Sequence, residues 1–178
     1  MKRMTAAAAV VASVLVVTGC SSSSDSGKKD DKKPGSGASR TPDAFGQDEA
    51  AMKAAAVKFR EATVHQDWRQ MCALETRQNR GGKSVDECAA SNGESHPGSP
   101  SSVTVEGNPV TVPASGDYIA GSGLMVVTTS NGEEGRSVHR VALRMVKEDD
   151  KWLVEQDADV YDTDMRHGAP VRDALMRS

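Results

Sequence analysis

The sequence predicts a domain of the α+β class, in which helices near its start pack on one side of an antiparallel sheet of three to five strands. Two observations carry this prediction. Apolar residues recur at helical spacing over 50–63, and beyond residue 102 they alternate with polar residues, as in a half-buried strand. The clear helical patterns precede the strand patterns, and this order is typical of an α+β domain.

Three helices are expected before the sheet. The first covers 50–63, where apolar side chains form a stripe and charged ones occupy the opposite side. Asp67 is a suitable N-cap for a second, short helix over 68–76. Ser84 and Glu87 have the spacing of a capping box and predict the start of a third helix.

Strands are expected from alternating residues between turn signals. Two short alternating runs flank a Gly-Asn-Pro turn at 107–109, and longer ones cover 117–129, 137–147 and 151–160. In the runs over 137–147 and 151–160, the alternation defines two faces. Expected on one face of 137–147 are His139, Val141, Leu143 and Met145, with Arg140 and Arg144 opposite. Expected on one face of 151–160 are Trp152, Val154, Ala158 and Val160, with Glu155, Asp157 and Asp159 opposite.

Two of the three cysteines, Cys72 and Cys88, lie within the expected domain. In an oxidising compartment an even pair predicts a disulfide, here closing a loop of 17 residues from 72 to 88 inclusive. Such a loop contributes about 3 kcal/mol in the chain-entropy model. A zinc site is the alternative use, although no Cys-x-x-Cys spacing or neighbouring His pair supports it.

The third cysteine, Cys20, follows a short basic start at Lys2 and Arg3 and an apolar run over 4–17. That run is too short for a membrane span of about 20 residues but fits the core of a secretory signal. The ending Val-Thr-Gly-Cys resembles the bacterial lipobox, as found in actinobacterial-type lipoproteins. The resemblance implies removal of residues 1–19 and a diacylglyceryl group on Cys20, anchoring the protein to the outer face of the cytoplasmic membrane. An ordinary signal peptide is the alternative.

Residues 20–48 are rich in Ser, Gly, Lys and Asp, and we expect a disordered tether that reaches about 30 Å. Without the signal, 20 basic residues face 25 acidic ones, so the net charge is −5. This balance argues against a nucleic-acid partner. The membrane is the expected partner through the lipid, together with an envelope protein or a small apolar ligand.

Three stretches, QDWRQMCAL, SVDECAA and DDKWLVEQDADV, follow one another in the order helix, helix and final strand. This pattern resembles the nuclear-transport-factor-two-like, or cystatin-like, cone. The resemblance covers 48–161 and implies a curved sheet wrapped over the long helix with a pocket between them. The expected domain is therefore 49–161, followed by a polar tail over 162–178, in which 170–176 could form a short helix or a frayed end. Candidate pocket residues are His139, Val141, Leu143, Trp152 and Phe59.

Other polar groups have simpler interpretations. His65 and Asp67 flank a helix break, where a cap and a helix-end residue explain them better than a catalytic pair. Asp157, Asp159, Asp162 and Asp164 do not match the calcium loop of an EF-hand. No metal and no cofactor are expected.

We therefore expect a non-catalytic, lipid-anchored binding or interaction module of the cell envelope, with no catalytic residue assigned. The alternative is a small cone enzyme of the isomerase or hydratase type, in which His139 acts together with a carboxylate or Tyr inside the pocket. A purely structural envelope protein without a pocket is the third hypothesis.

Overall fold

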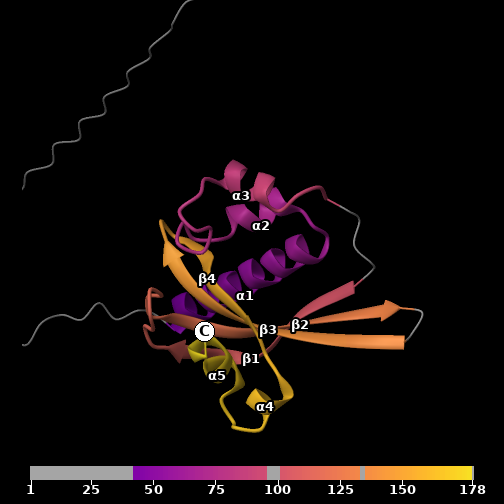
Figure 1. Cartoon of the computed structure of the whole chain (residues 1–178). Helices are drawn as coiled ribbons and strands as arrows, with labels where there is room; N and C mark the ends of the chain where they lie inside the picture. Colours follow the sequence, from indigo (N-terminus) through magenta and orange to yellow (C-terminus); the bar gives the residue numbers. More distant parts are fainter. Residues whose placement is uncertain (1–41, 96–100, 133–134, 178) are drawn as a thin grey trace, which may run out of the picture. The chain divides into compact units, whose positions relative to one another are not determined.

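A computed structural model describes residues 42–95, 101–132 and 135–177, all within the compact unit Ser39–Ser178. The expected signal peptide, Cys20 and the expected tether as far as residue 41 lie outside the described residues. The described chain forms these elements (Figure 1): α1 (Pro42–Val64), α2 (Trp68–Ala73), α3 (Val85–Ser91), β1 (Ser101–Val112), β2 (Gly121–Gly132), β3 (Gly135–Glu148), β4 (Lys151–Asp159), α4 (Asp162–Met165) and α5 (Pro170–Met176).

The four strands form one antiparallel sheet in the order β1-β2-β3-β4, so each strand pairs with its neighbour in sequence. This arrangement confirms the predicted α+β class and the antiparallel sheet. α1 lies across one face of the sheet, with α2 packed against α1 and α3 against α2, while α5 lies on the opposite face (Figure 1).

The apolar stripe of α1 builds the larger core. Its buried side chains are three or four residues apart, which places them on one side of the helix. They pack on alternate residues of the central strands, and each large side chain buried there contributes about 1.5–3 kcal/mol. The helix contributes Met52, Ala56, Phe59 and Ala62, and the sheet contributes Leu124, Val126, Val141, Leu143, Met145 and Val154.

The opposite face of the sheet is also buried, which the sequence-based prediction missed. Val171, Ala174 and Leu175 of α5 pack on Met125 and Val127 of β2, so the C-terminal residues belong to the folded core and are not a polar tail. The reason is visible in the chain: 124–127 is a continuous apolar run, and such a run suits a strand with both faces covered.

Gly123 allows α5 to approach the sheet closely. A Cβ at this position would lie 2.6 Å from side-chain atoms of both Val112 and Val171, closer than packed carbon atoms come. Any larger residue would therefore displace the helix or the neighbouring strand.

Several element boundaries differ from the prediction, and the starts of α1 and β2 differ by the most residues. α1 begins at Pro42, eight residues before the predicted start at 50, and proline is well suited to the first helical turn because it has no N–H to satisfy there. β2 begins at Gly121, so 117–120 is not strand. The connection over 113–120, called the β1–β2 connection below, is held by the fully buried Arg144.

The guanidinium of Arg144 fixes that connection with three hydrogen bonds. It donates to Pro113 O at 2.9 Å, to Ile119 O at 2.7 Å and to Ser115 Oγ at 2.9 Å, and it lies 5.5 Å from the ring centroid of Tyr118. These bonds hold the β1–β2 connection against β3, and the carbonyl of Ile119, within the predicted strand, bonds to a side chain.

β4 contains a β-bulge that reverses the predicted faces of its second half. Arg144 pairs with Gln156 and Met145 pairs with Val154, which leaves Glu155 as an extra residue. Trp152 and Val154 face α1, as predicted, but Ala158 and Val160 face α5. Asp157 and Asp159 consequently lie on the α1 face, on the same side of the sheet as His139.

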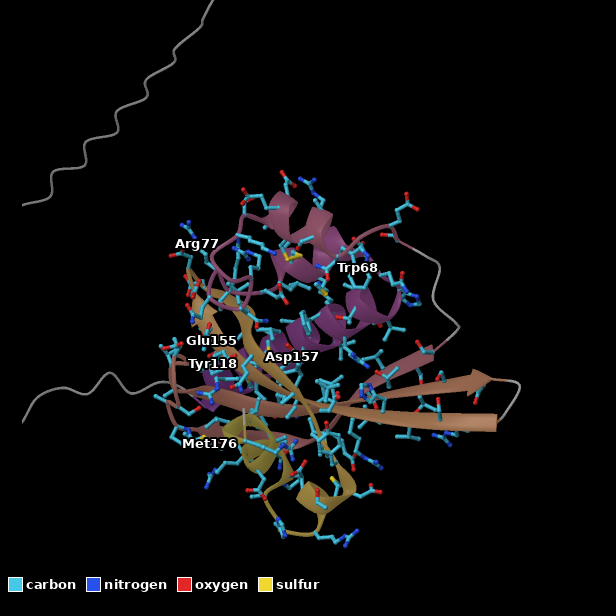
Figure 2. The ribbon with its side chains drawn as sticks, viewed as in Figure 1. Trp68, Arg77, Tyr118, Glu155, Asp157 and Met176 are labelled. Atoms are coloured by element: carbon cyan, nitrogen blue, oxygen red, sulfur yellow. A yellow bond between two sulfur atoms is a disulfide. The ribbon has the colours of Figure 1, made fainter. Side chains whose placement is uncertain are left out.

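Cys72 on α2 and Cys88 on α3 are joined by a disulfide, as predicted, and the bond connects the two short helices (Figure 2). The predicted caps are also present: Asp67 Oδ1 accepts from Gln70 N at 3.1 Å, and Ser84 and Glu87 form a capping box. In the part of the chain that the structure describes, no helix has the length and apolar character needed to cross a membrane.

Candidate functional site

Three of the five candidate pocket residues belong to the core between α1 and the sheet. Phe59, Val141 and Leu143 are almost completely buried and pack in the core between α1 and the sheet. Trp152 is half-buried beside that core, and its Nε1 donates to Asp48 Oδ1 at 3.2 Å. None of the five lines the hollow beside Glu106 or the hollow beside Ser101. Apolar side chains of α1 and of the sheet form one buried cluster here.

His139 lies at the polar margin of this core, where it forms a network across four elements. Arg60 of α1 donates through Nε to Thr128 Oγ1 at 2.9 Å and through Nη2 to His139 Nδ1 at 2.5 Å. His139 Nε2 lies 3.0 Å from Asp159 Oδ1 on β4. Side chains of α1, β2, β3 and β4 thus meet in one hydrogen-bonded series.

The donors in this series fix the tautomer of the imidazole. A guanidinium can only donate, so Nδ1 must accept from Arg60. The neutral ring therefore carries its proton on Nε2 and donates it to the carboxylate of Asp159. Both ring nitrogens are engaged, and the side chain of His139 is about half exposed (52%).

The β-bulge brings a second carboxylate, Asp157, to the same side of the sheet. Burial raises the pKa of Asp157, and Asp159 raises it further, whereas Arg60 lowers it. Burial lowers the pKa of Arg60, and the two aspartates oppose that change. Asp157 lies opposite Leu143 in the β3–β4 ladder, on the face that carries the apolar core, and the residue is partly open to solvent there (Figure 2).

Glu75 is a third acid near this network and is buried behind α2, with only 8% of its surface exposed. Burial, the largest cause, and the nearby Asp157 raise its pKa to about 7, although Arg80 acts in the opposite direction. Its Oε1 accepts from Asn79 Nδ2 at 3.2 Å, and its Oε2 lies 3.6 Å from Cys88 Sγ. A disulfide sulfur has no hydrogen, so a proton in this contact comes from the carboxyl group.

The same region contains a set of potential metal ligands. The sulfurs of Cys72 and Cys88 and a carboxylate oxygen of Glu75 all lie within 4.8 Å of one another. Zinc binding requires deprotonated thiols, and here the two sulfurs are bonded to each other. In this state the group offers a single carboxylate, which is too few ligands for a structural zinc site.

The other polar residues singled out by sequence have structural roles. Asp67 caps α2, while His65 is exposed beyond the end of α1. Asp164 accepts from Arg177 Nη1 at 2.6 Å and from Tyr161 N at 2.8 Å, so it serves to fasten the C-terminal segment. Asp159 is hydrogen-bonded to His139. The aspartates considered as calcium ligands therefore make separate contacts and do not form one ligand cluster.

A hollow of about 360 Å³ lies on the opposite face of the sheet, beside β1. We call it the β1 hollow; it is lined by Glu106, Asn108 and Val110 of β1, Met125 of β2 and residues 168–172 before and within α5. Met125 and Val171 are buried at its floor, whereas Glu106 and Arg172 are exposed at its rim. Its volume lies within the usual range of small-ligand sites.

Sequence reasoning identified His139 but missed Arg60, Thr128 and Glu75. The helical pattern placed Arg60 on the polar side of α1 and contained no signal for a contact with a strand 79 residues away. The β1 hollow could have been anticipated in part, since Val171, Ala174 and Leu175 follow the spacing of an amphipathic helix.

A comparison with protein-family models found no match, and a comparison with curated proteins found none either. The class of this protein is therefore defined by its fold and sites: an α+β domain with a four-stranded antiparallel meander, a disulfide between two short helices, a polar network at His139 and a hollow beside the edge strand β1.

Proposed function

We propose that this protein is a lipid-anchored, extracytoplasmic binding module of the cell envelope. The motif ending at Cys20 supports the anchor, and the Cys72–Cys88 disulfide fits an oxidising compartment. The β1 hollow carries the proposal of binding, because it combines a buried apolar floor with an exposed polar rim. We further propose that the domain is a variant of the cystatin-like cone whose interior is filled, since a long helix crosses an antiparallel meander and packs tightly on it.

The alternative, a cone enzyme using His139, has one favourable observation: the imidazole lies 3.0 Å from the carboxylate of Asp159. A general base, however, needs a free ring nitrogen within reach of a substrate. Arg60 occupies Nδ1, and Nε2 is directed at the carboxylate of Asp159, so neither ring nitrogen is free. Neither described hollow reaches the ring. We therefore favour a structural role for His139 in a network that joins α1 to the sheet.

The anchor is tested by expressing the full chain in a bacterium that processes lipoproteins and supplying labelled palmitate. The unaltered protein should incorporate the label and stay with the membranes, whereas Cys20→Ala should remain unlabelled and keep residues 1–19, because cleavage before residue 20 follows its lipidation. Cys72→Ala is the matched control and should keep both the label and the membrane location. Unlabelled wild-type protein, or palmitate labelling of Cys20→Ala, would refute the anchor.

A further inference from the structure

The two edges of the sheet differ in whether the chain itself covers them. At β4, Val154 N donates to Leu74 O at 2.8 Å, and Thr76 N donates to Val154 O at 2.9 Å. The segment after α2 thus occupies part of that edge. β1 pairs with β2 on one side, and within the described ranges no strand or bridge pairs with its other side. Such an edge carries backbone donors and acceptors that can accept an additional strand.

The β1 hollow lies beside this open edge, at an irregularity in β1. The pairing steps from Glu106–Met125 to Val110–Gly123, so residues 107–109 stand opposite Leu124 alone. Gly107 has a φ of 79°, a conformation that glycine adopts without strain. The bulge residues Gly107 and Asn108 line the hollow together with residues 168–172, and Met125 is buried at its floor. A side chain from a strand added at the edge has a nearby apolar space to enter.

The rim of the hollow carries charges of both signs. Glu106 and Arg172 are exposed and have no ion-pair partner among the described residues. Arg172 Nη2 donates to Thr111 O at a distance of 3.3 Å. A ligand that complements this rim has an apolar centre, a cationic group on the side of Glu106 and an anionic group on the side of Arg172.

We propose, resting on the function proposed above, that β1 and the β1 hollow bind an extended segment of a partner protein. The segment adds to the sheet as a strand beside β1 and inserts an apolar side chain into the hollow, while a basic and an acidic residue meet Glu106 and Arg172. Backbone pairing supplies affinity, and the hollow and the two charges select the sequence. A small apolar ligand would use the hollow but leave the strand edge unused.

A second copy of this chain fits the site less well. The regular part of β1 presents Ser102, Thr104 and Glu106 on the α5 face, because Val103 and Val105 face α1. A β1 strand from another molecule would therefore direct polar side chains toward the buried apolar floor. This mismatch favours a partner of different sequence.

The experiment titrates the isotope-labelled full chain with a short blocked peptide: threonine-rich, with a central leucine, a lysine near one end and a glutamate near the other. We expect saturable changes in the amide signals of β1 and 168–172. A peptide with N-methyl groups on alternate backbone nitrogens should bind about tenfold more weakly, because it lacks strand donors; replacing the leucine by serine should have a similar effect.

Protein variants locate the site independently. Ala169→Trp fills the hollow and Arg172→Glu reverses a rim charge, and each should weaken peptide binding about tenfold. Ala120→Trp, an equally large change at an exposed position outside the hollow, should bind like the unaltered chain. Unchanged amide spectra far from the hollow verify that the variants are folded, and the peptide variants require no change to the protein.

Four outcomes would overturn the inference: no change at millimolar peptide, changes confined to the α1 face, equal binding of the N-methylated peptide, or self-association through β1 that excludes the peptide. Each of these leaves the palmitate labelling of Cys20 unaffected. Failure of that labelling, in contrast, refutes the anchored location without altering the peptide titration, so the two proposals fail separately.

Discussion

Replacing Glu75 by Gln should remove a pH dependence from the stability of the domain. The carboxyl group is buried beside the disulfide, and its pKa is raised from 4.5 to about 7 by burial and by Asp157. The folded state therefore binds the Glu75 proton more tightly than the unfolded state does. Glutamine has the same shape as the protonated acid and no charge, so it preserves the neutral form at every pH.

The magnitude follows from the difference between the two pKa values. The pKa of Glu75 rises from 4.5 in the unfolded chain to about 7 in the folded domain. At about 1.36 kcal/mol for each pKa unit, protonation of Glu75 stabilises the folded domain by about 3 kcal/mol. The raised pKa fixes the sign. The stabilising contribution of protonated Glu75 is complete below about pH 4.5 and is lost as the pH rises through about 7. The free energy of unfolding contributed by this group should decrease by about 3 kcal/mol over that interval.

Urea unfolding of the wild type and of Glu75→Gln at pH values from 5 to 8 measures the difference directly. The two proteins should have similar stability at pH 5, and the variant should be more stable at pH 8 by about 3 kcal/mol. Glu148→Gln, at an exposed position beside the β3–β4 turn, controls for the loss of one negative charge. If the free energies of unfolding of the wild type and of Glu75→Gln differ by a constant amount from pH 5 to 8, Glu75 is not buried as described.

Three further substitutions test the packing. Arg144→Met should destabilise the domain by about 3 kcal/mol and speed amide exchange in the β1–β2 connection, because three acceptors lose a charged donor; Arg136→Met, on an exposed side chain, is the control, and equal stabilities would contradict the contacts. Gly123→Ala should cost about 1–3 kcal/mol in urea unfolding and loosen α5, since its Cβ would overlap two side chains; protected α5 amides would argue against this packing. The double serine variant of Cys72 and Cys88 should lose about 3 kcal/mol, as should the reduced wild type, and an unchanged urea midpoint would exclude a stabilising disulfide.

Local patterns predicted most of the framework. The helical spacing in α1, the caps of α2 and α3 and the alternation in β3 depend on residues close in sequence, and the structure contains all of them. The cysteine pair was also predictable, because an even number in an expected oxidising space leaves few alternatives.

The polar network was not predictable, because it depends on one extra residue in β4. With uninterrupted alternation, Asp157 and Asp159 would lie on the face away from Val154; the bulge at Glu155 moves them to the α1 face. No local pattern marks this bulge, since alternation continues on both sides of it. The contact between Arg60 and His139 then follows from the crossing of α1 over the sheet, which is a tertiary property.

The covering of the second sheet face was predictable in part. The continuous apolar run in β2 indicates burial on both sides, and α5 carries the apolar spacing to provide it. The close contact at Gly123 is the feature that connects these two observations. A glycine within a strand is often a site where another segment approaches the backbone.

The most direct test of the proposed function is the intact mass of the protein extracted from its native membranes without reductant and treated with iodoacetamide. The account predicts a chain of 159 residues beginning at Cys20, with a diacylglyceryl group on that residue and no alkylated cysteine. A chain with an unmodified Cys20, or alkylation of Cys72 and Cys88, would contradict it.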